Sequence, residues 1–472
     1  MLHSRLNDIL KTFTVYELNR FGRFIQSPYF NEDKKLVQCF NTLAPGYKRQ
    51  LEPPRQKAIW KAVYGIRPFS NIKFSRLCSD LAKKLDEFLV YDQLRNDEPQ
   101  KLLNLAAIYN DRKLTFFFEP ILKNARAKHQ KELYREADFF LREFKLEEAQ
   151  NAYLELQNQR STEKNINQTL QALDRFYFIQ KLNYLAALLH YKKFLSTEGE
   201  VALAGEILDY LKKKPAIDVP AIDIGYRIVL SLLEPEHDEH FVELKKLLAL
   251  HAAHFHKNTA RGFYVFAINF CIRRINAGKL NYVNESLLLY KEMLQNDLMT
   301  DETGALSQFD YKNIVTVALR TNDLAWAEKF IREYKNKLPL PYRQNAYTFN
   351  LAKLYFAKRK FDKVLPLLQD VVYTDIFYQL DSKTTLMKTY YELGEYLPMM
   401  ALKESFRVLL RRKKLISAQN RINYTNFMRF TMQLYRLDVK DTPKLNQLSK
   451  NIHTSTNVAD KGWLVEKLNE LS

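Results

Sequence analysis

The stretch LAKLYFAKRKFDKVLPLLQDV, residues 351–371, carries the pattern that decides the fold. Its apolar and small residues recur at three- and four-residue intervals in two blocks, which predicts two short amphipathic helices joined by a tight turn. The same spacing returns at residues 314–334 and 386–399, and more weakly at 270–290. The positions in the best block are Leu351, Ala352, Tyr355, Phe361, Val364, Leu368 and Val371. Small residues suit the crossing of two antiparallel helices, and bulky ones suit contact with the next pair. We therefore expect stacked helix pairs in this half of the chain.

This spacing resembles that of tetratricopeptide repeats. The resemblance implies an all-α, TPR-like solenoid over residues 261–412, with a concave surface that binds another protein or peptide. The match departs from the family in two ways. The units are 44, 37 and 35 residues apart rather than a constant 34, and Arg359 and Asn322 stand where a small residue is usual. We expect a degenerate array.

The rest of the chain also reads as helical. Residues 1–95 predict a compact helical head, with helices near 2–13, 15–26, 32–43, 55–64 and 71–92. Residues 96–260 predict a degenerate array of helix pairs, and residues 413–472 predict capping helices. Proline-containing segments such as Ala44-Pro45-Gly46 are expected to end helices, whereas Pro120 and Pro235 are expected to open them. About twenty helices follow from this division.

A second resemblance covers three separate runs. They are LNRFGRFIQSPYFN (18–31), LDRFYFIQKLNYL (173–185) and DKGWLVEKLNEL (460–471). These runs look like a group of long, all-helical bacterial proteins to which no activity is assigned. That resemblance implies architecture and a cytoplasmic location, and it supplies no catalytic residue.

The composition excludes several classes of protein. Only 11 of 472 residues are glycine, which argues against glycine-rich nucleotide loops and β-rich folds. The sequence contains no Walker loop, GxGxxG or GxSxG motif. No apolar run approaches a membrane span, and the N-terminus lacks the apolar core of a secretory signal. The three cysteines are far apart among apolar residues, so we interpret them as core thiols. These features favour a cytoplasmic protein without a bound cofactor.

Five of the nine histidines lie between residues 237 and 256. His237 and His240 are one helical turn apart, as are His251 and His254, but the two pairs are too far apart to share one ion. We therefore assign no metal site. A hydrolase or metal enzyme has no other support in the sequence, so we expect a non-enzymatic protein.

The net charge of the chain is +19, and residues 401–436, with nine basic residues and one acid, carry +8 of it. This segment predicts contact with phosphates or with an acidic partner. The alternative is a solvated outer face of the last helix pair. The candidate contact residues are Arg407, Arg411, Arg412, Lys413, Lys414 and Arg421.

Two functions follow as hypotheses. The first is an interaction scaffold that binds a protein or peptide in the solenoid groove. Its candidate groove residues, on the helices expected near 343–357 and 377–393, are Asn345, Asn350, Lys353 and Lys388. The second is a nucleic-acid-binding helical protein that uses the basic 401–436 segment.

Overall fold

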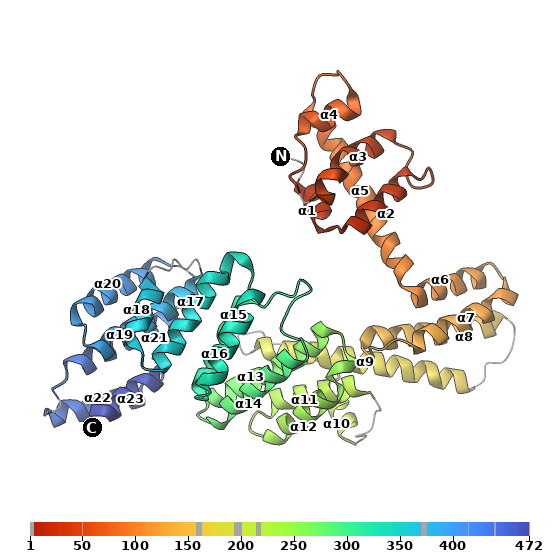
Figure 1. Ribbon diagram of the computed structural model, residues 1–472. Helices are drawn as coiled ribbons and strands as arrows, with labels where there is room; N and C mark the ends of the chain where they lie inside the picture. The colour runs from red at the N-terminus through yellow and green to blue at the C-terminus, as the bar shows by residue number, and fades with distance from the viewer. Residues whose placement is uncertain are drawn as a thin grey trace. The chain divides into compact units, whose positions relative to one another are not determined.

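The computed structural model describes residues 4–49, 51–156, 163–192, 201–213, 219–369, 375–413, 415–438 and 440–471 (Figure 1). Within these ranges it contains 23 α-helices and two short 3-10 helices, and no strand beyond one isolated bridge between Thr300 and Leu306. The all-α fold class is confirmed. No helix in the described ranges is long and apolar enough to span a bilayer.

The chain divides into two compact units, Met1–Lys181 and Leu182–Ser472, and the division falls inside helix α9 (Glu163–Lys192). We had expected four parts. The finer divisions at residues 95, 260 and 412 stay predictions within these two units.

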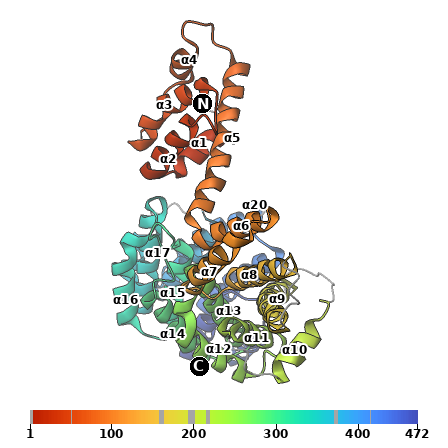
Figure 2. The same ribbon diagram turned by 90° about the vertical axis from the view of Figure 1, so that its right-hand side faces the viewer.

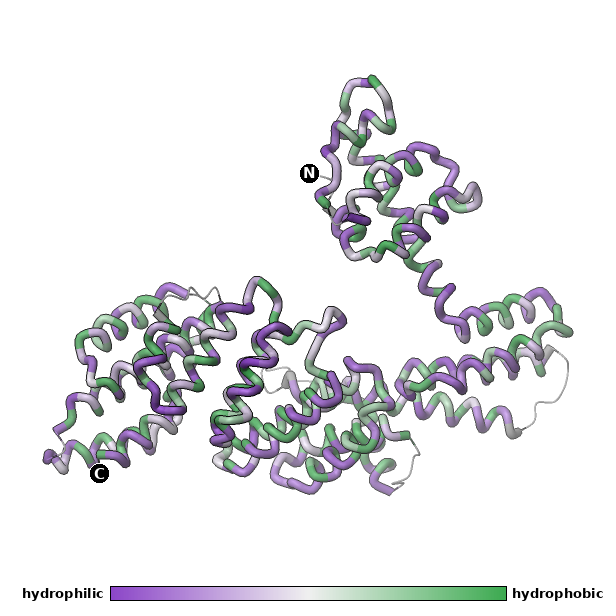
Figure 3. Tube along the Cα trace, in the orientation of Figure 1, coloured by the Kyte–Doolittle hydropathy of each residue, from purple (hydrophilic) through white to green (hydrophobic). Residues whose placement is uncertain are grey.

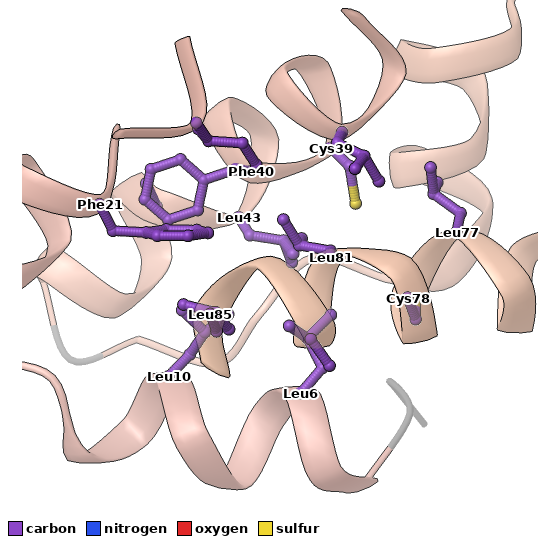
Figure 4. Packing of buried hydrophobic residues seen from close by; sticks show 14 of the residues in the cluster. Leu6, Leu10, Phe21, Cys39, Phe40, Leu43, Leu77, Cys78, Leu81 and Leu85 are labelled. Atoms are coloured by element: carbon purple, nitrogen blue, oxygen red, sulfur yellow. The ribbon is translucent and has the colours of Figure 1, made fainter. Parts of the chain in front are cut away.

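The first unit begins with the five helices expected for the head. They are α1 (Ser4–Thr12), α2 (Val15–Gln26), α3 (Lys34–Lys48), α4 (Gln56–Tyr64) and α5 (Asn71–Asn96). Side chains cap three of the N-termini: Thr14 forms a capping box with Glu17, and Asp33 and Ser70 cap α3 and α5. Figure 2 shows the four shorter helices gathered alongside α5. Their buried faces form one core, which includes the residues labelled in Figure 4.

Prolines end fewer helices in this unit than the sequence suggests. Helix α3 continues through Ala44-Pro45-Gly46, where we expected a break. Pro120 lies inside α7 (Thr115–Gln130) and does not open it. Each proline lies near one end of its helix and removes one intrahelical hydrogen bond, and the apolar packing of both helices tolerates that loss. In the second unit, Pro235 lies in the turn before the helix Asp238–His251 and does not open that helix.

The first unit also contains α6 (Glu98–Asp111), α7, α8 (Ala137–Leu156) and the first part of α9. The joint expected around residues 95–99 is the single residue Asp97, which caps α6 by accepting a hydrogen bond from the Gln100 amide at 3.0 Å. A small core centred on Phe118 and Leu122 holds α6, α7 and α8 together.

The second unit consists of successive helices that pack against their sequence neighbours. Hydrophobic and hydrophilic residues alternate along them (Figure 3). The helices are α10 (Ala204–Lys213), α11 (Pro220–Leu233), α12 (Asp238–His251), α13 (Lys257–Asn276), α14 (Asn281–Gln295), α15 (Gln308–Arg320), α16 (Leu324–Glu333), α17 (Leu340–Ala357), α18 (Phe361–Gln369), α19 (Ile376–Leu393), α20 (Tyr396–Arg412), α21 (Ala418–Arg436), α22 (Thr442–Thr454) and α23 (Lys461–Leu471).

One turn geometry recurs between paired helices of this unit. Gly278, Asn322, Arg359 and Gly394 follow α13, α15, α17 and α19, and all four have positive φ, between 53° and 90°. In each turn the backbone N–H of the positive-φ residue donates to the carbonyl three residues earlier. The backbone N–H of the residue that follows it donates to the carbonyl five residues before its own position. These are the two hydrogen bonds of a Schellman motif, which ends a helix and reverses the chain. The four helix pairs therefore share the same backbone reversal, whether or not glycine is present.

The closing run DKGWLVEKLNEL packs against α19. Trp463 donates its indole N–H to Glu392 at 3.0 Å, and the buried ammonium of Lys467 pairs with the same carboxylate at 2.8 Å. The core of this region includes Met387, Phe427, Trp463 and Leu464. This packing fixes the first residue of the run, Asp460, beside the side chains of α19.

Candidate functional site

Three lysines from alternate helices gather on one side of the second unit. Lys312 on α15 pairs with Asp381 on α19 at 2.8 Å, and Lys388 on α19 pairs with Asp460 at 2.5 Å. Between them, Lys353 on α17 donates from Nζ to Thr316 Oγ1 on α15 at 2.9 Å. We call Lys312, Lys353 and Lys388, with Thr316, Asp381 and Asp460, the lysine face. Its members lie up to 148 residues apart in sequence, so the fold brings them together.

The sequence pattern explains this alignment. Thr316, Lys353 and Lys388 each stand two residues after the first apolar position of their unit, Ile314, Leu351 or Leu386. Residues at one offset in stacked helix pairs lie in a row on the same face. Thr316 carries no charge and was not among the expected groove residues, although comparing this offset between units would have found it.

Lys353 is the electrostatically unusual member of the lysine face. Its pKa falls to about 8, chiefly because burial disfavours the charged ammonium. The carboxylates of Asp381 and Asp460 favour the charged form, and the nearby Lys388 and Lys312 oppose it. Among the described residues Lys353 forms no ion pair. The residue is half-buried, and its ammonium has one hydroxyl partner, Thr316. It therefore has the capacity to accept an anion.

The charges of the lysine face also shift the pKa values of Asp460 and of the neighbouring Tyr424. Burial alone would raise the pKa of Asp460, but the adjacent Lys388 and then Lys353 lower it. Tyr424 on α21 shows the opposite effect, because burial and the carboxylates of Asp381 and Asp460 raise the pKa of its phenol. The face thus holds fixed charges of both signs, with Lys353 as the cation that has no carboxylate of its own.

The four expected groove residues have different positions. Lys353 and Lys388 lie on neighbouring helices of the lysine face, and Asn345 is half-buried near the start of α17. Asn350 is fully buried and donates to the Ala346 carbonyl at 2.8 Å, so it does not line an accessible groove. The reason is its position one turn from both Ala346 and Leu354, which are buried along the same stripe of α17.

The contact residues expected in the basic segment lie in different environments. Arg407, Arg411, Arg412 and Lys413 are exposed on the second half of α20 and just after it. Arg421 instead donates to the Lys413 carbonyl at 3.2 Å and so helps to end α20. Lys414 lies outside the described residues. Of the expected contact residues, Arg407 lines a cavity between α20, α21 and α22.

Four of the histidines between residues 237 and 256 lie in two pairs. The ring centroids of His237 and His240 are 6.1 Å apart, and those of His251 and His254 are 5.8 Å apart. His240 also contacts Glu234 at 2.8 Å. In the described ranges no three histidine, cysteine or acidic side chains are grouped so that they could hold a metal ion.

No known protein family, curated protein or solved structure matches the chain. The lysine face, the recurrent turn and the basic segment are therefore the features that indicate a function.

Proposed function

We propose that this chain is a TPR-like helical-repeat scaffold that binds a peptide segment of another protein on the lysine face. The observation that carries the proposal is Lys353, a half-buried cation with one hydroxyl partner and no carboxylate. A peptide carboxylate at this point would supply the missing charge and restore the usual preference of a lysine for its protonated form.

Two further features support a repeat scaffold. The Schellman turns at Gly278, Asn322, Arg359 and Gly394 give four successive helix pairs the same reversal. The spacing of these turns, 44, 37 and 35 residues, equals the spacing of the apolar pattern. Stacked pairs of this kind present one helix of each pair to a common surface, and such surfaces commonly bind peptides. We assign no enzymatic activity, and we keep the cytoplasm as the proposed location because Cys39, Cys78 and Cys271 are free, buried thiols.

Binding of short labelled peptides to the full-length chain tests the proposal. A fluorescence-anisotropy panel would compare ten-residue peptides of acidic, neutral and basic composition. We expect the acidic peptides to bind most tightly. The Lys353→Met substitution should lower the affinity for them at least tenfold. Lys329→Met is the matched control, because Lys329 is exposed on α16 and outside the lysine face.

The pH dependence adds a second readout. The bound carboxylate needs the ammonium form of Lys353, so affinity should fall as the pH rises from 8 toward 9.5. The Lys353→Met variant should lose this pH dependence. The proposal is wrong if no peptide class binds, or if both lysine variants bind equally well. Binding of RNA in preference to all peptides, lost on reversal of Arg411 and Arg412, would favour the nucleic-acid alternative.

A further inference from the structure

A cavity of about 1230 Å³ lies in the helical head, between α1, the start of α2, the end of α3 and the chain that leads into α4. Every residue that lines it, except Leu10, is exposed or half-buried, so the cavity is an open groove. We call it the head groove. Cavities that hold a single small molecule usually measure about 300–1,000 Å³. The head groove exceeds that range and therefore has room for a segment of a polymer.

Hydrogen bonds hold the walls of the head groove in place. The Tyr47 hydroxyl near the end of α3 donates to the Asn7 side chain on α1 at 2.7 Å. Residues 51–55 form one irregular wall, and Leu51 anchors this wall to α3 by donating its amide to the Gly46 carbonyl at 2.9 Å. Helix α4 begins directly after the wall. Because both ends of the irregular wall are attached to helices, the groove exists before any ligand is bound.

Part of the lining of the head groove is apolar and accessible. Val15 is 48% exposed and Leu51 is 60% exposed. Phe13, Pro53 and Pro54 also line the groove, and each of them is half-buried. Water therefore reaches aliphatic and aromatic carbon in this groove, and an apolar side chain of a ligand would displace that water.

Exposed cations line the same groove. They are Lys11, Lys48, Arg55 and Lys57. Within the described residues, none of the four forms an ion pair. Two other cations of the head, Arg5 and Arg20, do pair with carboxylates, namely Asp86 and Asp92 on α5, at 2.6 and 2.8 Å. The cations of the head groove thus have no ion-pair partner in the head, which makes the groove complementary to an acidic ligand.

We propose that the head groove binds an extended, acidic segment of a partner protein. Carboxylates of that segment would pair with Lys48 and Arg55, and its aliphatic side chains would cover Val15 and Leu51. The inference goes beyond the peptide site on the lysine face, because the head groove belongs to the first unit and shares no residue with that site.

An acidic peptide fits the head groove better than nucleic acid. The four cations share the lining with two carboxylates, Asp8 and Glu52, so the excess is two positive charges. Those carboxylates would repel a continuous row of phosphates, whereas the backbone N–H groups of a peptide can donate to them. An extended segment fits better than a helix, because a helix uses its N–H groups internally beyond its first turn. Within the described residues the carbonyls of Pro53 and Pro54 also accept no hydrogen bond, so they are available to an extended ligand.

The test uses the full-length chain with the Lys353→Met substitution, so that the lysine face does not contribute. The probe is a fluorescein-labelled nine-residue peptide in which glutamate alternates with valine or leucine. One control peptide has lysine in place of every glutamate, and another has serine in place of every apolar residue. We expect the probe to bind at least tenfold more tightly than either control. A version with proline at the central position does not form a helix and should bind within threefold of the probe.

Two charge-reversal variants locate the acidic contacts. Lys48→Glu/Arg55→Glu alters the head groove and should lower the affinity for the probe at least tenfold. Lys61→Glu/Arg67→Glu makes the same change of net charge on exposed residues of the head outside the groove, and it should lower the affinity less than threefold.

A second pair of variants locates the apolar contacts. Leu51→Ser should lower the affinity at least fivefold, whereas Ile66→Ser removes a fully exposed isoleucine outside the groove and should leave the affinity unchanged. A photoreactive group on an apolar residue of the probe should also cross-link the unaltered groove within residues 7–15 or 51–57, a readout that needs no groove variant to fold.

Four results would overturn the proposal. The first is equal binding of the probe and its control peptides. The second is equal loss of affinity in the two charge-reversal variants, which indicates general charge attraction. The third is a central proline that abolishes binding while the probe becomes helical on binding, as measured by circular dichroism. The fourth is tight binding of a 20-nucleotide RNA that Lys48→Glu/Arg55→Glu abolishes while no acidic peptide binds, which would assign the groove to nucleic acid. A failed peptide panel at the lysine face would leave these measurements unaffected, because the chain used here lacks Lys353.

Discussion

Replacing Lys353 by methionine should stabilise the second unit. Methionine keeps much of the length of the side chain and removes the buried ammonium, which is close to Lys312 and Lys388 as well as to Asp381 and Asp460 and donates to the Thr316 hydroxyl. The hydroxyl would not be left without a partner, because Thr316 Oγ1 also donates to the Lys312 carbonyl at 2.8 Å. The variant therefore removes a poorly compensated charge and leaves its surroundings satisfied.

The pKa of Lys353 sets the size of the effect. A fall from 10.5 to about 8 corresponds to about 3 kcal/mol, since one pKa unit equals 1.36 kcal/mol. Solvent reaches part of the side chain, so we expect a net gain in the free energy of unfolding of about 2 kcal/mol at pH 7.

The sign of the pH dependence is fixed by the lowered pKa. Below pH 8 the folded and unfolded chains both hold the proton, so the folded chain carries the full electrostatic penalty. Between pH 8 and 10.5 the folded chain releases the proton first, and the penalty disappears. The wild-type chain should therefore approach the stability of Lys353→Met as the pH rises to 10.

Urea unfolding at pH 7 and pH 10 measures this difference. Tryptophan fluorescence is a suitable probe, because Trp326 and Trp463 lie in the second unit and Trp60 in the first. Lys329→Met again serves as the exposed control and should change stability by less than 0.5 kcal/mol at either pH. The reasoning fails if Lys353→Met is less stable than wild type at pH 7, or if its advantage is the same at both pH values.

Three further predictions concern single side chains. His129 is 2% exposed, with no hydrogen-bond partner at either ring nitrogen among the described residues, and burial lowers its pKa to about 4. The first unit should therefore lose up to about 3 kcal/mol of stability as the pH falls from 6.5 to 4, and His129→Leu should abolish that loss in urea titrations. Lys113 has a φ of 58°, so Lys113→Gly should raise the free energy of unfolding by about 1 kcal/mol in thermal denaturation. The buried Arg274 guanidinium pairs with Glu236 and Asp238, at 2.5 and 2.6 Å, and stacks near two rings, so Arg274→Ala should destabilise the second unit by about 3 kcal/mol, measured by the urea midpoint.

The helices of the head could be predicted because their signals are local. Amphipathic spacing and capping residues such as Thr14, Asp33 and Ser70 mark each segment within a few residues. The prolines were less informative about helix ends. One hydrogen bond lost near the end of a helix costs less free energy than the apolar packing of that helix contributes. Pro45 and Pro120 therefore lie inside helices that local rules would have ended or started there.

The turn at Arg359 shows what local patterns miss. A positive φ is unfavourable for arginine by about 1–2 kcal/mol, and Arg359 stands where the tetratricopeptide pattern usually has a small residue. The structure places its guanidinium against Glu466 at 3.2 Å and Glu470 at 2.8 Å, both on α23. These partners follow more than 100 residues later, and no inspection of the turn itself could reveal them.

Asn350 was wrongly expected in the groove for a related reason. A polar residue in an amphipathic pattern ordinarily marks the solvent side of a helix. Helix α17 is enclosed on more than one side, since Thr348, Leu351 and Ala352 are buried as well as the stripe that contains Asn350. The polarity of one side chain then says little about exposure, and the buried side-chain NH2 group of Asn350 donates internally to the Ala346 carbonyl.

The lysine face depends on both local and distant sequence. Local periodicity contributes the common offset of Thr316, Lys353 and Lys388, which predicts corresponding faces on their three helices. Asp460 joins that row only because the closing helix docks on α19 through Trp463 and Lys467. Docking gives Lys388 its carboxylate and leaves Lys353 without one, since Asp381 is held by Lys312. Truncation before Asp460 should therefore alter peptide binding at Lys353, because Lys388 would lose its carboxylate and become a second cation facing the same anion.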